Sequence, residues 1–343
     1  MEPIHASHPA DQGSSPQETI LQLLQGFAVT QALYVATKLG IADHLQHGPQ
    51  SCTSLAEQTG TNADALCRLL RALASMGIFT ETAPAVFDLT PLALCLQTDS
   101  PQSLRNFILF RTEQDYVYWQ HALYTIRTGE SAFEHTFGVE RFAYFQQHPE
   151  IKDHFHRGMG EVSVLNDTAL IAAYDFTGMQ TVIDIGGSHG TRLATLLEHY
   201  PTLRGILFEQ ATTLEQAQKS LRAGGVLDRC DLVAGDWFTS IPTGGDAYLL
   251  SILHRWNDAR CLTLLTNCHQ AMSPTARLLI LERVITPTTP WRIHLADLNM
   301  LLSSSGQIRT DSAFQELLTR AGFTLTRIIP TDSAISIIEA TPR

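Results

Sequence analysis

The chain has 343 residues, which is enough for about two domains at roughly 150 residues each. Hydrophobic residues make up 44% of it and charged residues 17%, a composition that excludes a disordered, collagen-like or coiled-coil protein. Thirty-four acidic and 23 basic residues give a net charge of −11, which disfavours a surface for nucleic acid or an anionic membrane.

Residues 1–15 are polar and rich in Ser and Pro, and they lack the basic start and apolar stretch of a signal peptide. We expect a frayed tail. No unbroken apolar run approaches the roughly 18 residues needed to cross a bilayer. The six cysteines show no Cys-x-x-Cys spacing, which favours reduced, mostly buried thiols in a cytoplasmic protein.

Residues 16–110 have a helical pattern that ends in a short two-stranded wing. Apolar residues recur at helical spacing from Ile20 to Leu39. A further helix is expected to begin with Thr53 as its N-cap. The helix after it places an apolar face on Leu66, Leu69, Leu70, Leu73 and Met76. Residues 78–80 and 86–89 then form the wing, so the layout is that of a winged helix.

This layout raises the alternative of a DNA-binding regulator, in which the second helix enters the major groove. Residues 1–105 contain four basic residues and nine acidic ones, so their net charge is 4 − 9 = −5. A DNA-binding surface needs the opposite sign. The apolar excess of the first helices instead favours dimer packing.

Aromatic residues crowd the segment from Phe107 to Phe155. They indicate either a helical core that joins two domains or the wall of a pocket for a flat, apolar substrate. The sequence leaves both interpretations open.

From Gly178 onward, strands and helices alternate, which predicts a doubly wound α/β domain. The expected strands are Thr181–Ile185, Gly205–Glu209, Asp231–Ala234, Asp246–Leu250, Arg277–Leu281, Thr324–Ile329 and Ala334–Glu339. The expected helices are His189–His199, Thr213–Arg222, Asp258–Met272 and Ser312–Ala321. Only four residues separate the last two strands, so this pair is expected to be an antiparallel hairpin.

The segment Val182–Gly190 joins the first of these strands to a helix through a glycine-rich turn. Such a turn places backbone N–H groups and a helix N-terminus beside a ligand. Gly186 and Gly187 leave room for a cofactor, and Gly190 allows the helix to pack closely. The spacing is not the GxGxxG of dinucleotide-binding enzymes, so the turn alone is weak evidence.

Acidic and aromatic residues follow at the ends of the next strands. Glu209 lies 23 positions after Gly186, where its carboxylate can accept hydrogen bonds from a ribose diol. Gly235–Phe238 follows the third strand and offers the carboxylate of Asp236 and two aromatic faces to an adenine. Asp184 can meet a positively charged amino group. Each of them alone has an ordinary structural explanation, but together they predict a nucleoside site.

His254 and Glu282 form the candidate acid–base pair. They follow the fourth strand and close the fifth, so both are expected at the carboxyl edge of the sheet. A carboxylate can fix the tautomer of an imidazole, which then removes a proton near neutral pH. His154 and His156 lack a third ligand, so no metal site is expected.

These motifs resemble the S-adenosylmethionine-dependent O-methyltransferases of the caffeate and hydroxyindole type, over roughly residues 16–343. The resemblance is carried by Tyr174–Phe176, Asp184–Gly190, Tyr200–Pro201, Gly235–Phe238, Gly244–Leu250, Leu253–Trp256, Leu281–Glu282, Asp297–Met300 and Arg309–Thr310. It implies a Rossmann-like class I methyltransferase domain, with a seven-stranded, mostly parallel sheet and an antiparallel last pair. It also implies an N-terminal, all-α, winged-helix-like dimerisation domain over residues 16–110. Residues 111–343 would hold a helical linker with the substrate region, and the methyltransferase domain.

The resemblance further implies a cytoplasmic homodimer that binds S-adenosylmethionine and a small aromatic substrate, but no nucleic acid or membrane. His254 would be the general base, with Glu282 and Arg255 beside it. The cofactor would be bound by Asp184, Gly186, Gly187, Ser188, Glu209, Gln210, Gly235, Asp236, Trp237 and Ser251. The substrate pocket would include Phe155, Met159, Trp256, Asp297, Met300 and Ile308.

Four positions depart from the family pattern. Ser188 replaces a usual glycine and Glu209 a usual aspartate, and both residues are compatible with cofactor binding. Arg255 stands where an aspartate usually follows the histidine, and Ile308 stands where a second glutamate usually flanks it. Only Glu282 therefore remains of the flanking carboxylates.

The favoured function is methyl transfer to a phenolic or enolic hydroxyl of an aromatic or polyketide-like small molecule. An alternative is a non-methylating member that keeps bound S-adenosylmethionine and catalyses hydroxylation, decarboxylation or a pericyclic rearrangement. In that case Arg255 could stabilise a developing oxyanion. A third alternative is a winged-helix regulator that senses the cofactor.

Overall fold

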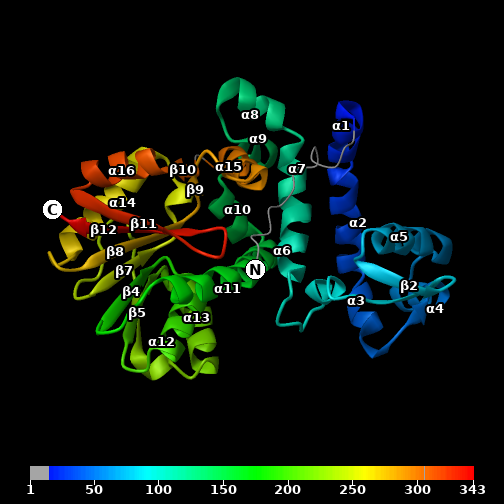
Figure 1. Cartoon of the computed structure of the whole chain (residues 1–343), viewed down its shortest axis with the longest axis horizontal. Coiled ribbons are helices and arrows are strands. Elements are labelled where there is room, and N and C mark those ends of the chain that lie inside the picture. The colour runs from blue at the N-terminus through cyan, green and yellow to red at the C-terminus, as the bar shows by residue number, and fades with distance from the viewer. Residues whose placement is uncertain (1–14, 305) are drawn as a thin grey trace. The chain divides into compact units, whose positions relative to one another are not determined.

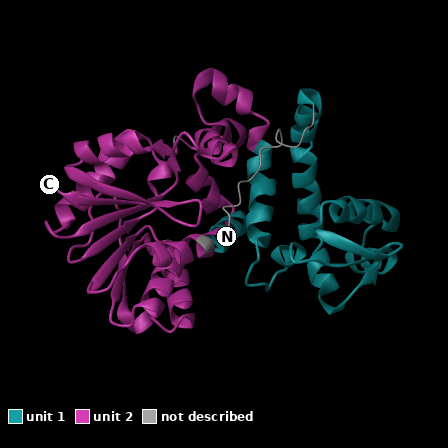
Figure 2. Cartoon of the chain, viewed as in Figure 1, with its two compact units in different colours: residues 1–117, 150–161 teal, residues 118–149, 162–343 magenta. Residues whose placement is uncertain are grey.

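The computed structural model describes residues 15–304 and 306–343 (Figure 1). The chain forms two compact units (Figure 2). Unit 1 takes in the described residues up to Val117 together with Glu150–Glu161, and unit 2 takes in Tyr118–Pro149 and Val162–Arg343. The tail expected at residues 1–15 lies outside the described residues except for Ser15, and the domain boundary expected at residue 110 remains a prediction.

Unit 1 is a small helical domain with a three-stranded antiparallel sheet. Its helices are α1 (Pro16–Leu24), α2 (Gly26–Lys38), α3 (Ile41–His44), α4 (Cys52–Thr59), α5 (Ala63–Ser75) and α6 (Arg105–Phe110), with the helical turns η2 (Leu45–His47), η3 (Ala93–Leu96) and η4 (Arg111–Asp115). Its strands β1 (Gln50–Ser51), β2 (Phe79–Ala83) and β3 (Val86–Leu89) lie in the order β1-β3-β2. Leu55, Leu70, Phe79 and Phe87 are fully buried in its core. This layout confirms the predicted helix, turn, helix and wing.

Three details of unit 1 correct the expectations from the sequence. The N-cap of α4 is Ser51, whose hydroxyl accepts the backbone N–H of Ser54, so Thr53 lies inside the first turn. The second detail is the sheet: the sequence predicted two strands, but β1, which ends at Ser51, adds a third. Met76 is not on the buried face of α5: it is 40% exposed, because the helix ends there and the chain turns at Gly77 with a φ of +77°.

The first two helices carry an exposed apolar surface. Ile20, Leu21, Leu23, Leu24 and Phe27 are each between 48% and 63% exposed. By length and composition alone the stretch Pro16–Lys38 could also cross a membrane, although polar residues interrupt its apolar ones. This is weak evidence, because helices of soluble proteins pass the same test. An exposed apolar helix face is a feature of protein–protein interfaces.

Unit 2 is built on a seven-stranded sheet in the order β11-β12-β8-β7-β4-β5-β6. The strands are β4 (Thr181–Ile185), β5 (Arg204–Glu209), β6 (Cys230–Ala234), β7 (Ala247–Leu250), β8 (Arg277–Glu282), β11 (Phe323–Pro330) and β12 (Ser336–Pro342). The strands from β8 to β6 are parallel, and β12 runs antiparallel to both of its neighbours. This confirms the mostly parallel sheet and its final hairpin.

Helices cover both faces of this sheet. They are α12 (Thr191–His199), α13 (Ala211–Ala223), α14 (Asp258–Ala271) and α16 (Asp311–Arg320), with the turns η5 (Leu227–Arg229) and η6 (Leu253–Arg255) nearby. Helix α15 (Trp291–Ser303) packs instead against two smaller helices, α8 (Ala122–Thr128) and α9 (Ala132–Phe137). Four short helices and one long helix precede the sheet. The short ones are α7 (Tyr116–Trp119), α8 (Ala122–Thr128), α9 (Ala132–Phe137) and α10 (Arg141–Gln147), and the long one is α11 (Pro149–Ala173). Side chains alternate along each strand, so Leu249 packs with α12 and α13 while Leu250 packs with α14 and α16. All six cysteines are free thiols, and five of them are buried, as expected.

The strand order sets where a ligand can bind. The chain moves outward from β4 through β5 to β6 and then returns to the other side of β4 with β7. In open α/β sheets, ligands bind at the carboxyl ends of the strands where the order reverses in this way. The loops that follow β4 and β7 carry the glycine-rich turn and His254, so these two motifs meet at the reversal point.

Candidate functional site

The glycine-rich turn after β4 is held in a strained backbone conformation. Gly186 and Gly190 have φ values of +69° and +73°, and Ser188 has a φ of +54°, which is unusual for a residue with a side chain. At Gly187 an added Cβ would overlap the carboxylate of Asp184 and approach Leu207 within 2.7 Å. The glycines therefore let the turn lie directly on the first two strands.

Asp184 lies beneath this turn and is fully buried. Arg192 of α12 comes within 3.5 Å of its carboxylate and also donates to Asp167 of α11 at 3.0 Å. Burial raises the pKa of Asp184 to about 6, although the charge of Arg192 acts to lower it. The structure thus gives Asp184 a protein cation as its partner, and its contact with a cofactor amino group stays a prediction.

The raised pKa of Asp184 makes stability depend on pH in a defined direction. The folded state holds the Asp184 proton up to about pH 6, whereas the unfolded chain releases it near pH 4. The carboxyl group therefore contributes stability that is lost as the pH rises between these values. We expect the free energy of unfolding of Asp184→Asn, minus that of the wild type, to rise by about 2 kcal/mol from pH 4.5 to pH 7.

Urea denaturation of both proteins across this pH range measures the difference. Asp231→Asn is the matched control, because it removes the same carboxyl group from a side chain that is 68% exposed. A difference for Asp184→Asn that is constant with pH would contradict a carboxyl group that titrates near pH 6.

Glu209 connects the end of β5 to the glycine-rich turn. Its carboxylate accepts the backbone N–H of Ser188 at 3.1 Å and that of Gln210 at 2.7 Å. The side chain is 6% exposed, and burial raises the pKa of Glu209 while these two N–H groups oppose the shift. The structure therefore brings three of the predicted cofactor residues together.

The loop after β6 lies beside Glu209. The backbone N–H of Gly235 donates to the carbonyl oxygen of Glu209 at 3.1 Å. The carboxylate of Asp236 is exposed and accepts the backbone N–H of Phe238. The indole N–H of Trp237 is buried and has no acceptor among the described residues. This leaves a hydrogen-bond donor for a ligand in the region where an adenine was expected.

His254 and Glu282 form the predicted pair. The Nδ1 atom of His254 lies 2.8 Å from both carboxylate oxygens of Glu282, and its backbone N–H also donates to Glu282 at 3.2 Å. Burial acts to raise the pKa of Glu282, but the charge and hydrogen bonds of His254 outweigh it and leave this pKa below its usual range. Because the carboxylate accepts the proton on Nδ1, it selects the tautomer in which Nε2 can accept another. The His254 side chain is 23% exposed, so a small molecule can reach it.

Arg255 and Trp256 lie next to aromatic residues from other elements. The guanidinium of Arg255 is 5.8 Å from the ring centre of Phe142 on α10, and the Trp256 ring stacks beside the same ring at 6.3 Å. Burial lowers the pKa of Arg255, and the charge of Glu209 opposes this shift. Arg255 therefore brings a partly desolvated positive charge to the neighbourhood of the His254–Glu282 pair.

The other predicted residues have varied surroundings. The Ser251 hydroxyl donates to the carbonyl oxygen of Leu281 at 2.8 Å. Asp297 of α15 accepts the backbone N–H of Ile308 at 2.6 Å, and the Ile308 side chain is buried. Met300 on the same helix is half-buried.

Phe155 and Met159 belong to the part of α11 that lies in unit 1. Phe155 packs edge-on against Phe110 at 5.1 Å, and Met159 is half-buried. Their place in a substrate pocket stays a prediction. In the part of the chain that the structure describes, no three His, Cys, Asp or Glu side chains are grouped so that they could bind a metal ion.

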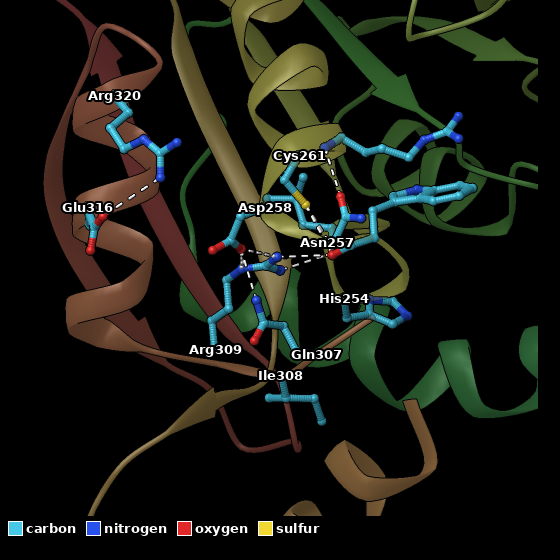
Figure 3. Close-up of polar contacts among 12 residues, drawn as sticks. His254, Asn257, Asp258, Cys261, Gln307, Ile308, Arg309, Glu316 and Arg320 are labelled. Atoms are coloured by element: carbon cyan, nitrogen blue, oxygen red, sulfur yellow. Dashed lines mark hydrogen bonds and ion pairs between the residues drawn. The ribbon is translucent and has the colours of Figure 1, made fainter. Parts of the chain in front are cut away.

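Sequence reasoning assigned no role in the site to several polar residues that support it. Arg309 on β10 (Arg309–Thr310) and Asp258 at the start of α14 form an ion pair at 2.7 Å beside the His254 loop (Figure 3). The ion-pair partners Asp167 and Arg192 were also missed. Arg309 and Asp258 are 51 positions apart, and no local pattern links them.

The fold and the site together define a class of protein. The buried acid, the glycine-rich turn and the acid–base pair lie at the reversal point of a Rossmann-like sheet, which is the arrangement of an enzyme that uses a nucleoside cofactor. The chain belongs to the O-methyltransferase family. Residues 119–324 match the family's O-methyltransferase domain, and residues 21–99 match its O-methyltransferase dimerisation domain.

Individual relatives agree with this assignment. A phenazine O-methyltransferase from Lysobacter antibioticus is 42% identical over 96% of this chain and 98% of its own length. The crystal structure of LaPhzM has 41% identity and a TM-score of 0.92, over 96% of this chain and 100% of that chain. Human N-acetylserotonin methyltransferase, solved in complex with S-adenosylmethionine, has 26% identity and a TM-score of 0.88, over 96% of this chain and 99% of that chain.

The protein is therefore a methyltransferase, and its cofactor is S-adenosylmethionine. The residues present fit this molecule. Glu209 has a buried carboxylate at the end of β5, where a ribose diol could donate to it, and Trp237 has a buried N–H without an acceptor among the described residues.

Proposed function

We propose that the protein transfers a methyl group from S-adenosylmethionine to a phenolic or enolic hydroxyl of an aromatic or polyketide-like small molecule, with His254 as the general base. The observation that carries this proposal is the placement of His254 Nδ1 at 2.8 Å from both oxygens of the buried Glu282. The cofactor supplies an electrophilic methyl group on a sulfonium, so the chain's own residues need to bind, orient and deprotonate the acceptor.

His254 acts on the acceptor through Nε2. A phenol has an ordinary pKa of about 10 and is mostly protonated at pH 7, so a base that takes its proton raises the reactive fraction. Glu282 holds the imidazole and stabilises the imidazolium that forms. Arg255 adds a positive charge that favours the phenolate. The ten residues from Asp184 to Ser251 named above as cofactor residues would bind the cofactor.

The acceptor class is supported by the relatives and by the aromatic surroundings of the site. The phenazine O-methyltransferase and the O-demethylpuromycin-O-methyltransferase of Streptomyces alboniger, 42% and 37% identical, are named for aromatic substrates. Phe142, Phe238 and Trp256 form a connected aromatic group in unit 2, and Trp256 follows His254 by two residues. Flat rings suit such a wall. With His254 and Glu282 retained, methyl transfer is favoured over a non-methylating reaction or a regulatory role.

We also propose that the protein works as a cytoplasmic homodimer. The dimerisation-domain match covers residues 21–99, and the apolar side chains exposed on α1 and α2 lie in and next to this segment. A second copy of the chain would cover this surface.

The test combines binding with transfer. The purified protein is titrated with S-adenosylmethionine by calorimetry and then incubated with methyl-labelled cofactor and a panel of phenols, flavonoids, quinols and hydroxyphenazines. We expect binding, and transfer of label to a hydroxyl oxygen. Binding without transfer to any acceptor would favour the non-methylating alternative, and absence of binding would contradict both.

A further inference from the structure

The segment Gly306–Thr310 lies directly against the loop that carries His254. At Gly306 an added Cβ would overlap the carbonyl oxygen of His254. Two residues farther on, the backbone of Ile308 is anchored by Asp297 of α15. Arg309 and Thr310 then form β10, which pairs in parallel with β9 (Val284–Ile285), just after Glu282. The segment is thus fixed to the same strand end that holds the partner of His254.

Arg309 binds this loop on both sides of His254. Its guanidinium donates to the carbonyl oxygen of Leu253 at 3.2 Å and to that of Trp256 at 3.0 Å. Figure 3 shows Arg309 reaching toward this loop from the segment that carries Ile308. The residue is 3% exposed, so water does not compete freely for these bonds.

Asp258 holds the same guanidinium from the other side. Its Oδ1 atom accepts from Nε and Nη2 of Arg309 at 3.0 and 2.7 Å, and from the side chain of Gln307 at 2.9 Å (Figure 3). Charge-assisted bonds of this kind are stronger than neutral ones, and the planar guanidinium fixes their directions. One buried side chain therefore joins both carbonyls of the loop to the first residue of α14.

Different groups hold His254 and the loop on either side of it. Glu282 orients the imidazole through Nδ1 and also accepts the backbone N–H of His254, whereas the loop carbonyls of Leu253 and Trp256 accept from other donors. Apart from Arg309, the donor to these carbonyls among the described side chains is the thiol of Cys261, at 3.3 Å from Leu253 and 3.5 Å from Trp256. A thiol is a weak donor. Without Arg309, the Leu253 carbonyl would keep the backbone N–H of Trp256 as a donor, but both carbonyls would lose their charged donor while the imidazole stayed hydrogen-bonded.

We propose that Arg309 is a positioning residue for methyl transfer: it fixes the loop that presents the Nε2 atom of His254 to the acceptor, and Asp258 fixes Arg309. This inference rests on the proposed role of His254 as the base. A misplacement of about 1 Å at a catalytic group can lower a rate by about 100-fold.

The test compares Arg309→Met and Arg309→Lys with Arg320→Met. Arg320 is the matched control because it lies on α16, is 49% exposed and forms a longer ion pair, 3.7 Å from Glu316 (Figure 3). We expect Arg309→Met to lower kcat by about 10- to 100-fold, with the affinity for S-adenosylmethionine within about two-fold of the wild type. Arg309→Lys should recover only part of the loss, because an ammonium cannot reach both carbonyls as a fork. Arg320→Met should behave like the wild type.

A second readout does not depend on activity. In ¹⁵N-labelled, cofactor-free protein, the imidazole signals of His254 should shift and broaden in Arg309→Met but not in Arg320→Met. The pH profile of kcat should change with them. If Arg309→Met does not fold, Asp258→Asn is the second variant, since it removes the ion pair and keeps the guanidinium; kcat should fall up to about 10-fold.

The outcomes separate this inference from the proposed function. A folded Arg309→Met with wild-type kcat and unchanged His254 signals would overturn the positioning role. If Arg309→Met does not fold, wild-type values in Asp258→Asn would overturn it. A loss of activity in Arg309→Met that is explained entirely by weaker binding of S-adenosylmethionine would also overturn it. If His254→Ala keeps full activity, the base assignment fails instead. Inactive His254→Ala beside fully active Arg309→Met would leave the proposed function intact and contradict the positioning role alone.

Discussion

Replacing His254 by alanine is expected to lower the rate of methyl transfer by about 10²–10⁴-fold, which is the usual contribution of a general base. The substitution removes the Nε2 atom that takes the hydroxyl proton and leaves the buried Glu282 without its side-chain hydrogen-bond donor. Apart from Ser251, the residues proposed to bind the cofactor lie on other loops, so the affinity for S-adenosylmethionine should stay within about two-fold of the wild type.

Single-turnover rates with a hydroxyl acceptor, measured from pH 6 to pH 10, test this expectation. Below the acceptor's pKa, the residual rate of His254→Ala should rise with pH, because the acceptor then ionises in solution rather than by transfer to the enzyme. His199→Ala is the matched control: His199 is exposed and ends α12, at the other end of that helix from the glycine-rich turn. A His254→Ala enzyme with the wild-type rate at pH 7 would contradict the assigned base.

The placement of His254 and Glu282 could be predicted from the sequence because both follow apolar strands. Near-continuous apolar runs indicate strands covered on both faces, and parallel strands bring their carboxyl ends to one edge. The positions of the strand ends are therefore enough to predict that these two residues lie close together. The 2.8 Å contact between them is consistent with that simple origin.

The face of the sheet toward which Asp184 points could not be predicted in the same way. Val182 and Ile183 are both fully buried, in clusters on opposite faces, so the sequence gives no polar side from which to assign the register. Asp184 shares the face of Val182, where α11 and α12 pack. Its ion-pair partner is therefore Arg192 on α12, and the positions of the strand ends do not predict this contact.

Helix α15 was missed because its apolar residues lie on all sides. Ile293 and Leu302 are buried, but Trp291, Leu295 and Leu301 are between 37% and 49% exposed. Such a helix gives no single apolar stripe at the 3.6-residue period.

Replacing Arg192 by methionine is expected to lower the free energy of unfolding at pH 7 by about 3–5 kcal/mol, because it leaves buried carboxylates without a cation. The side chains of Asp167, Asp184 and Arg192 are 3%, 0% and 12% exposed, so water can replace little of the lost interaction. Urea denaturation measures the effect. Arg204→Met is the matched control, since Arg204 lies 4.0 Å from Asp231 in an exposed pair whose loss should cost less than about 1 kcal/mol.

A second substitution in the network of Asp167, Asp184 and Arg192 tests whether the stability lost in Arg192→Met comes from charge or from packing. If the cost of Arg192→Met comes from the uncompensated charge of Asp184, adding Asp184→Asn should restore much of the lost stability at pH 7. The cost of Arg192→Met should also shrink as the pH falls below about 6, where Asp184 is protonated in the folded state. A cost that is unchanged by pH and by the second substitution would show that Arg192 stabilises the turn through packing of its aliphatic stem.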